Sequence, residues 1–410
     1  MTILCIATYF KGDPFLREAK RQGATVLLLT ADSLASAAWP RESIDEVHTI
    51  SRDSDDAAIR RRVDTIARRH RIDRITALDD FDVEMAAMLR EHLQVAGIGR
   101  TTASRVRDKL AMRVAAQGAG IPVPEFTATF NDEAVNTWAA RVPPPWVLKP
   151  RSSAAAIGIK KVVSHDELWR ALDAAGDHRS ETVLEQFVAG DVYHVDSIVW
   201  NGSVVFAVPF KYGRPPMEIA HQGGLFVTRR LADASPEGAP LLELNQRLQS
   251  MLGLYRGVSH SEFIRFGGPG GSGRSGTAGR AEPDADAGFV FLETSARVGG
   301  AFIVDTIEAA TGVNLWAEWA KIDVGGEDYV LPPRRDDFSA IVLTLARQEM
   351  PDMSAYTDHE IAKTIRKEHH AGVIVASSDA QRVDALVADY TTRFYRDFFA
   401  TAPAPDRPLE

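Results

Sequence analysis

The chain has 410 residues, of which 45% are hydrophobic and 25% charged, the composition of an ordinary globular protein with roughly two or three domains. Its net charge of −9 and its lack of long basic runs argue against a protein that binds nucleic acid or a membrane surface. Cys5 is the only cysteine, and no apolar run reaches about 18 residues. The sequence therefore predicts no disulfide, no cysteine-based zinc site, no membrane span and a cytoplasmic location.

Residues 1–100 predict a parallel α/β domain. The expected strands are 3–7, 25–30, 47–50 and 74–78, and the expected helices are 15–22, 55–70 and 83–92. Strands that alternate with helices form β-α-β units, which require parallel pairing. The first turn lacks G-x-G-x-x-G, so no NAD site is expected. Asp79, Asp80 and Asp82 follow the fourth strand, where they either stabilise the next helix through its dipole or contact a substrate.

Residues 101–190 predict a linking segment and a small lobe. A helix at 108–117 precedes a strand, W-V-L-K-P, that carries Lys149 and leads into the small-residue loop R-S-S-A-A-A-I-G. Small side chains let backbone N–H groups approach phosphate oxygens, and a lysine adds a positive charge. Taken alone, a lysine beside such a loop is a weak signal. A helix at 166–174 and the segment E-Q-F-V-A-G-D follow.

Residues 191–325 predict a larger lobe, and residues 326–400 a C-terminal α/β lobe. The first begins with a hairpin of strands 194–200 and 204–209 joined at Asn201-Gly202, and Lys211 follows. Residues 267–288 are rich in Gly and Ser and predict a flexible insertion. The C-terminal lobe is expected to contain a strand at 340–347, a helix at 360–367, a strand at 372–377 and a helix at 379–399. A mobile tail is expected at 401–410.

Two acidic residues mark the candidate site. Glu262 lies in an expected strand at 259–265, and Glu293 closes another at 289–292. If these strands pair antiparallel, the two carboxylates converge on one face and, with Ser295 and Arg297, can hold Mg²⁺ and a phosphate. The alternative is a hairpin with solvated charges, and the residues alone leave both interpretations open.

Several motifs together resemble the ATP-grasp superfamily, in its carboxylate–amine ligase branch, which includes biotin carboxylase-like and amino-acid ligase-like proteins. They are E-x-S-x-R-x-G-G at 293–300, H-x-E at 260–262, D-K-L-A-M-R at 108–113, W-V-L-K-P at 146–150 and E-Q-F-V at 185–188. The resemblance covers roughly residues 95 to 320. It implies an ATP-grasp fold with an N-terminal parallel α/β domain, mixed α/β and α+β lobes that enclose ATP, and a C-terminal α/β lobe.

The resemblance also implies roles for individual residues. The nucleotide phosphates would be contacted by Lys109, Lys149 and Ser153, the adenine edge by Glu185, Gln186, Phe187 and Val188, and the ribose by Asp191. The metal, Mg²⁺ or Mn²⁺, would be bound by Glu262, Glu293 and Ser295. The reacting phosphoryl group would be contacted by Lys211 and Arg297. This chain departs from the family pattern in two places. Ser295 replaces the usual Asn, and the loop after Lys149 contains less Gly.

The implied activity is an ADP-forming ligase that activates a small carboxylate, such as an amino acid, as an acyl phosphate and couples it to an amine. Two alternatives remain open: an ATP-grasp enzyme with bicarbonate or a thiol as acceptor, and a nucleotide-binding module without turnover. The expected partners are small-molecule substrates, without nucleic acid or membrane, and a homodimer is possible by analogy. The sequence does not specify the acid or the amine.

Overall fold

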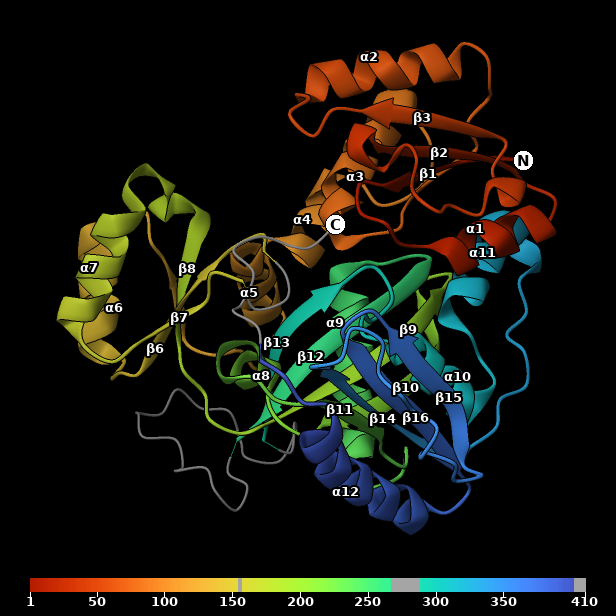
Figure 1. Ribbon diagram of the computed structural model, residues 1–410. Coiled ribbons are helices and arrows are strands. Elements are labelled where there is room, and N and C mark those ends of the chain that lie inside the picture. The colour runs from red at the N-terminus through yellow and green to blue at the C-terminus, as the bar shows by residue number, and fades with distance from the viewer. Residues whose placement is uncertain (154–156, 267–287, 402–410) are drawn as a thin grey trace.

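The computed structural model describes residues 1–153, 157–266 and 288–401, which form three sheets (Figure 1). The predicted insertion at 267–288, apart from Gly288, and the predicted tail, apart from Thr401, lie outside the described residues. No helix in these ranges is long and apolar enough to cross a membrane.

The first sheet is parallel, as predicted, with the order β3-β2-β1-β4. Its elements are β1 (Thr2–Ala7), β2 (Thr25–Ala31), β3 (Glu46–Ile50), β4 (Arg74–Ala77), α1 (Asp13–Arg21), α2 (Asp56–Ala67), α3 (Val83–Leu93) and α4 (Arg100–Arg107). The apolar run of β1 is buried on both faces, which is typical of a strand inside a parallel sheet.

The second sheet belongs to a small lobe that projects from the rest of the molecule (Figure 1). Its strands pair antiparallel in the order β5-β8-β6-β7. The lobe consists of β5 (Phe126–Ala128), α6 (Asp132–Arg141), β6 (Trp146–Pro150), β7 (Lys160–Val162), α7 (His165–Ala175) and β8 (Thr182–Gln186). Trp138 of α6 and Leu168 of α7 pack with Trp146 in its core. The helix α5 (Lys109–Gly118) leads into this lobe.

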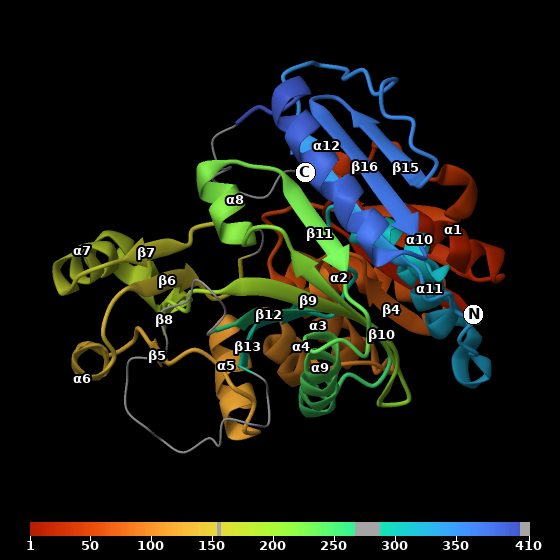
Figure 2. The ribbon, with the colours of Figure 1, turned by 90° about the horizontal axis from the view of Figure 1, so that it is seen from below.

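The third sheet, called the large sheet, has eight antiparallel strands in the order β13-β12-β9-β10-β11-β14-β16-β15. Its strands are β9 (Asp191–Trp200), β10 (Ser203–Tyr212), β11 (Phe226–Arg230), β12 (Gly257–Arg265), β13 (Phe289–Ser295), β14 (Phe338–Leu345), β15 (Ile361–Lys367) and β16 (His370–Ser377). Its helices are α8 (Pro216–Gln222), α9 (Gly238–Leu252), α10 (Ile303–Thr311), α11 (Leu315–Gly325) and α12 (Ala380–Asp397). The C-terminal strands therefore extend this sheet and do not form one of their own (Figure 2).

One predicted element is wrong: the segment at 360–367 is the edge strand β15 and not a helix. Ile361, Thr364 and Ile365 are β-branched and favour a strand. Among the residues of β15 only Ile365 is buried, and the exposed lysines and arginine are typical of a protected sheet edge. The charged pattern nevertheless resembles a solvated helix locally, and the pairing with β16 decides in favour of the strand.

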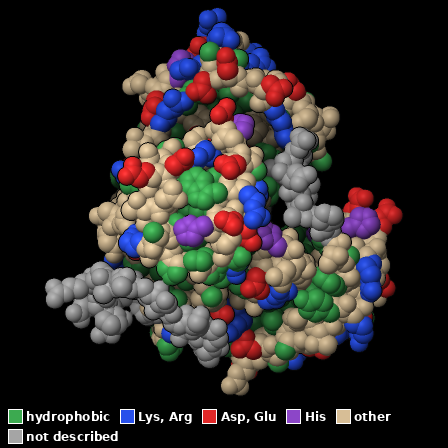
Figure 3. Space-filling view, turned by 90° about the vertical axis from the view of Figure 1, so that its left-hand side faces the viewer, with side chains coloured by type: hydrophobic (Ala, Val, Ile, Leu, Met, Phe, Trp, Pro, Cys, Tyr) green, Lys and Arg blue, Asp and Glu red, His purple; other side chains and the backbone are tan. Residues whose placement is uncertain are grey.

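The N-terminal domain and the large sheet share apolar cores. Leu4 and Ile6 of β1 belong to the same buried cluster as Phe263 of β12. At another contact, the rings of Phe15 on α1 and Trp319 on α11 lie 5.2 Å apart. On the face that includes the small lobe, the described acidic and basic side chains are interspersed rather than segregated by sign (Figure 3).

Candidate active site

The candidate site is a pocket between the sheet of the small lobe and the large sheet. Charged residues of α5, β6, β8, β12 and β13 line it: Lys109, Lys149, Glu185, Glu262 and Glu293. Apolar residues from three sides also line it: Val147, Ile159, Phe187 and Val188 of the small lobe and its exit, Pro215, Pro216 and Met217 at α8, and Val192, Ile264 and Leu292 of the large sheet. Three further polar residues, Ser153, Gln186 and Glu218, belong to the lining as well. A charged end beside an apolar slot suits a ligand with a flat ring and an anionic tail.

Glu262 and Glu293 lie directly opposite each other on the antiparallel strands β12 and β13, so the expected pairing is confirmed. Phe263 lies opposite Phe291, and the register shifts by one residue between this pair and the two acids. Leu292 is the extra residue, and it lines the pocket together with Glu293. Such a bulge lets two successive side chains point to one side, which brings Glu293 into the pocket beside Glu262.

Lys109 connects the acidic pair to the small-residue loop. Its ammonium lies 3.1 Å from a Glu293 oxygen and donates to the Ser153 carbonyl at 2.7 Å. Its backbone N–H donates to the Arg151 carbonyl at 2.8 Å. Burial alone would raise the pKa of Glu293, but Lys109, Lys149 and other cations lower it to about 2. Glu293 is therefore ionised at neutral pH.

Two of the charged residues that line the pocket, Lys149 and Glu185, form a buried triad with Arg113. The Lys149 ammonium is 2.7 Å from Glu185 Oε2, and Arg113 Nε is 3.0 Å from Glu185 Oε1. Arg113 is 0% exposed. Burial lowers the pKa of Lys149 to about 8, against the attraction of Glu185. Burial would raise the pKa of Glu185, but Arg113 and Lys149 outweigh it and lower that pKa.

Arg113 was not among the predicted site residues. The motif D-K-L-A-M-R contained the signal, because Arg113 follows Lys109 by four residues and thus lies on the same face of α5. For Glu185 the sequence predicts only a role of the backbone, at the adenine edge, and none for the side chain. Its carboxylate instead joins two cations from two other elements.

The predicted adenine segment runs along the pocket at the end of β8, where Gln186, Phe187 and Val188 all line the wall. The Phe187 N–H donates to the Pro145 carbonyl at 3.0 Å, which fixes this segment against the small lobe. The Lys161 ammonium lies 3.8 Å from the centre of the Phe187 ring. The Phe187 ring thus has a defined position in the pocket wall.

Four predicted site residues are not among those that line the described pocket: Asp191, Lys211, Ser295 and Arg297. Asp191 and Lys211 form an ion pair of 2.7 Å on β9 and β10. Ser295 is buried opposite His260. Arg297 donates through Nη1 to the Val298 carbonyl at 2.7 Å, and its Nε is buried without a hydrogen-bond partner among the described residues.

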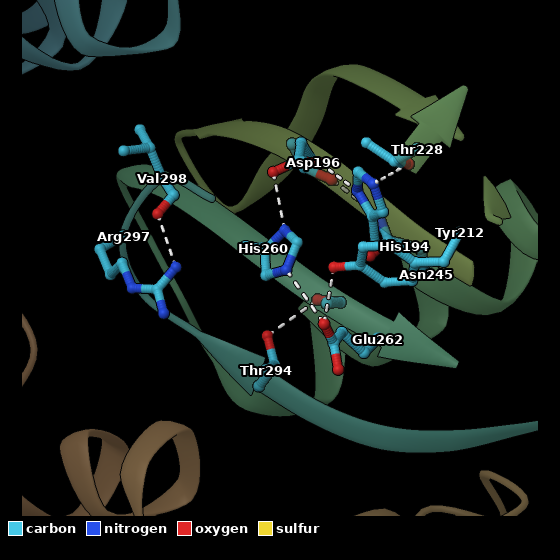
Figure 4. Close-up of polar contacts among 12 residues, drawn as sticks. His194, Asp196, Tyr212, Thr228, Asn245, His260, Glu262, Thr294, Arg297 and Val298 are labelled. Carbon is cyan, nitrogen blue, oxygen red and sulfur yellow. Dashed lines mark hydrogen bonds and ion pairs between the residues drawn. The ribbon is translucent and has the colours of Figure 1, made fainter. Parts of the chain in front are cut away.

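A polar cluster beside Glu262 was only partly foreseen (Figure 4). Tyr212 donates to Glu262 Oε1 at 2.8 Å, and His260 Nε2 lies 3.5 Å from the same oxygen. Asp196 lies 2.9 Å from His260 Nδ1. Burial would lower the pKa of His260, but Asp196 and Glu262 raise it to about 9. The H-x-E motif contains His260, but the sequence predicts a role only for its Glu262, and H-V-D at 194–196 lies within an expected strand.

The donor set fits a hard divalent cation. Glu262 and Glu293 present carboxylates to the same pocket from neighbouring strands, and the Ser295 hydroxyl follows on β13. Mg²⁺ and Mn²⁺ prefer oxygen ligands, and Mg²⁺ typically uses one or two carboxylates together with substrate phosphates. The two lysines in the pocket supply further positive charge for such phosphates.

Comparisons with known proteins agree with this geometry. A family profile described as the ATP-grasp N-terminal domain matches residues 16–95. The chain is 24% identical over 259 residues to the L-arginine-specific L-amino acid ligase of Bacillus subtilis, covering 62% of this chain and 58% of the relative. It is 30% identical over 98 residues to the D-alanine–D-alanine ligase of Hydrogenovibrio crunogenus, covering 24% of this chain and 31% of the relative.

The crystal structure of the L-amino acid ligase from Bacillus licheniformis superposes with a TM-score of 0.73 and 16% identity, over 98% of this chain and 99% of that one. Residues 16–95 thus match an ATP-grasp N-terminal domain, and the chain as a whole has the fold of ATP-grasp proteins. The predicted family and fold are therefore confirmed, and the pocket between the small lobe and the large sheet is the candidate site of an ATP-grasp protein. The match spans little more than half of the first curated relative and about a third of the second, so the particular reaction is a separate question.

Proposed function

We propose that the protein is an ATP-dependent, ADP-forming ligase that activates a small carboxylate as an acyl phosphate and couples it to an amine. The observation that carries the proposal is the direct opposition of Glu262 and Glu293 in a pocket that also contains Lys109 and Lys149. Two carboxylates placed beside two lysines suit a nucleotide phosphate chain with its divalent cation. A solvated hairpin would have no need to orient both acids into one pocket.

The nucleotide would extend through the pocket from its apolar slot to its charged end. Phe187, Val188 and Met217 would enclose the adenine, and Gln186 and the Glu185 backbone would border its edge. Lys109, Lys149 and the loop at Ser153 would bind the phosphates. Asp191, now paired with Lys211, would exchange this partner for the ribose hydroxyls.

Glu262, Glu293 and Ser295 would hold Mg²⁺ or Mn²⁺, which when bound neutralises the charge that develops on the β- and γ-phosphate oxygens. The contribution of the chain is to align these acids, and to keep Glu293 ionised, before the ligands arrive. Glu293 meets this requirement through Lys109, which holds its pKa near 2. Glu262 is aligned by the hydroxyl of Tyr212.

In the first step an oxygen of the substrate carboxylate attacks the γ-phosphorus, the bond to the β–γ bridging oxygen breaks, and ADP leaves. In the second step the amine nitrogen attacks the acyl carbon, inorganic phosphate leaves, and the nitrogen loses a proton. Arg297 would hold the carboxylate and the acyl phosphate through its guanidinium, whose Nε is buried without a hydrogen-bond partner among the described residues. Lys211 would supply charge to the same group, and positioning accounts for most of the rate.

An amino acid is the favoured carboxylate. Both curated relatives described above are named as amino-acid ligases, and they match this chain over 259 and 98 residues. The proposal predicts ADP and phosphate release that requires both an amino acid and an amine. The measurement is a coupled assay with ATP, Mg²⁺ and a panel of amino-acid pairs, with bicarbonate and thiols as alternative acceptors.

Release that depends on a particular pair would support the ligase and identify its substrates. Release only with bicarbonate or a thiol would replace the amine by another acceptor within the same superfamily. ATP binding without turnover on any acceptor would favour a nucleotide-binding module and contradict the ligase.

The affinity for ADP is expected to depend on pH through Lys149. Its pKa of about 8 means that the ammonium loses its proton as the pH rises through this value, and attraction to phosphate is lost with it. We expect nearly constant affinity below pH 7 and a decrease approaching about tenfold per pH unit above the pKa. Calorimetric titration of ADP between pH 6.5 and 9.5 would measure it. Lys149→Met should bind more weakly with a flatter profile, and parallel profiles would contradict the assignment.

A further inference from the structure

The large sheet carries a buried polar cluster just beyond the pocket, consisting of His194, Asp196 and His260 (Figure 4). In the register of β9 and β12, His260 lies opposite Asp196 and Glu262 lies opposite His194. Side chains of paired residues point to the same face of a sheet, so the cluster shares the face of Glu262. The three residues are not among those that line the described pocket, so they would act on a ligand only through other side chains.

Asp196 holds both histidines. Its Oδ2 lies 2.6 Å from His194 Nδ1, and its Oδ1 lies 2.9 Å from His260 Nδ1. His194 Nε2 is occupied by the Thr228 hydroxyl at 2.8 Å. The second ring nitrogen of His260 faces Glu262 Oε1 at 3.5 Å. The two histidines therefore differ in the partner of their Nε2 atom: His194 contacts the buried Thr228, and His260 contacts Glu262, a proposed metal ligand.

A carboxylate that fixes one ring nitrogen of an imidazole also fixes the direction of the other nitrogen. Asp196 is 0% exposed and sits on a central strand, so the His260 ring has little freedom to rotate. Tyr212 and His260 approach the same oxygen of Glu262 from different strands. These two contacts fix one oxygen of Glu262 and thereby direct the other.

The same pair also supports the turn that carries Arg297. A Cβ atom on Gly299 would lie 3.0 Å from both Asp196 Oδ1 and His260 Nδ1, closer than side chains normally pack. The backbone at Gly299 therefore rests directly on the His260–Asp196 hydrogen bond, two residues after Arg297. A change in the His260–Asp196 pair would therefore alter both the orientation of Glu262 and the position of the turn that carries Arg297.

We propose that His260, held by Asp196, is a positioning residue that orients Glu262 for the divalent cation and supports the turn of Arg297. This inference rests on the proposed function of the pocket and assigns a task to residues that do not themselves touch the nucleotide. A competing interpretation is a separate metal centre, because the ligand atoms of His194, Asp196 and His260 lie within 4.8 Å of one another. The hydrogen bonds favour positioning, since each Asp196 oxygen already has its own imidazole partner.

The test compares His260→Asn with His194→Asn in the full chain. Asn places an amide nitrogen near the position of Nδ1, so both variants retain a donor to Asp196. Only His260→Asn removes the ring nitrogen that lies 3.5 Å from Glu262 Oε1, whereas His194→Asn removes the one bonded to Thr228. The readout is Mn²⁺ binding in the presence of ADP, followed by electron paramagnetic resonance, together with ADP binding without metal. We expect about 10- to 100-fold weaker Mn²⁺ binding in His260→Asn, unchanged metal-free ADP binding, and Mn²⁺ affinity like the wild type in His194→Asn.

His260→Gln provides the conservative comparison, because its amide nitrogen lies near the position of Nε2, and it should recover part of the Mn²⁺ affinity. If His260→Asn does not fold, Asp196→Asn tests the same pair and should also weaken Mn²⁺ binding. Wild-type Mn²⁺ affinity in folded His260→Asn, alongside loss in Glu262→Gln, would overturn the positioning role alone. Absence of Mn²⁺–ADP binding by the wild type would overturn the proposed function as well. A transition metal bound to the purified protein and lost in His260→Asn would establish the metal centre instead.

Discussion

Replacing Glu293 with Gln is expected to lower ADP formation about a thousandfold while the protein remains folded. The amide preserves the shape of the side chain but removes the charge that would hold the divalent cation opposite Glu262. It also releases Lys109 from its 3.1 Å ion pair, so the ammonium is no longer held toward this end of the pocket. The rate loss should accompany a much higher requirement for Mg²⁺.

The measurement is initial ADP release over a range of Mg²⁺ concentrations, with thermal unfolding of the same samples as the check on folding. Glu243→Gln on the exposed side of α9 makes the same chemical change away from the pocket and should behave like the wild type. A Glu293→Gln variant with normal ADP release and an unchanged Mg²⁺ requirement would remove Glu293 from the proposed metal site.

The strands that carry the two acids could be predicted because apolar and β-branched residues mark them clearly. Their geometry could not be predicted fully from the alternation of side chains. Phe291 faces the core, and a regular strand would send Glu293 to the same side. The bulge at Leu292 changes this, and nothing in the local sequence specifies it. The prediction that the acids converge was therefore correct, but the structural cause is a local irregularity.

Residues paired over long distances were harder to find. His194 and Asp196 look like ordinary members of a strand, and their relation to Glu262 depends on which strand pairs with β9. The segment at 360–367 presents the same problem, because its pairing with β16 decides between strand and helix. The motif residues, by contrast, could be carried over from a resemblance, and nine of the thirteen line the pocket: Lys109, Lys149, Ser153, Glu185, Gln186, Phe187, Val188, Glu262 and Glu293.

The charged triad of Glu185, Arg113 and Lys149 connects parts of the fold and also contributes side chains to the candidate pocket. Glu185 is 3% exposed and is the shared carboxylate of Arg113 and Lys149, two cations contributed by α5 and β6. The guanidinium of Arg113 also lies 5.6 Å from the centre of the Phe291 ring, on the strand that carries Glu293. The triad thus joins the small lobe, α5 and the large sheet at the pocket.

Replacing Glu185 with Leu is expected to lower the free energy of unfolding by about 3–5 kcal/mol. The substitution leaves Arg113 buried without its carboxylate, and a guanidinium does not lose its proton to escape this cost. Lys149 can escape by deprotonation, which would also remove its charge from the nucleotide site. Urea-induced unfolding, followed by circular dichroism at pH 7, would measure the loss.

The double variant Glu185→Leu/Arg113→Met separates the unpaired charge from the loss of packing. Because it removes both partners of the buried pair, it should regain most of the stability that Glu185→Leu loses. If the double variant is no more stable than the single one, Glu185 stabilises the fold through something other than its pairing with Arg113. If stability is regained while ADP binding remains weak, the triad has two separable tasks. The pair of Arg113 and Glu185 stabilises the junction of the lobes, and Glu185 keeps Lys149 charged for the phosphates.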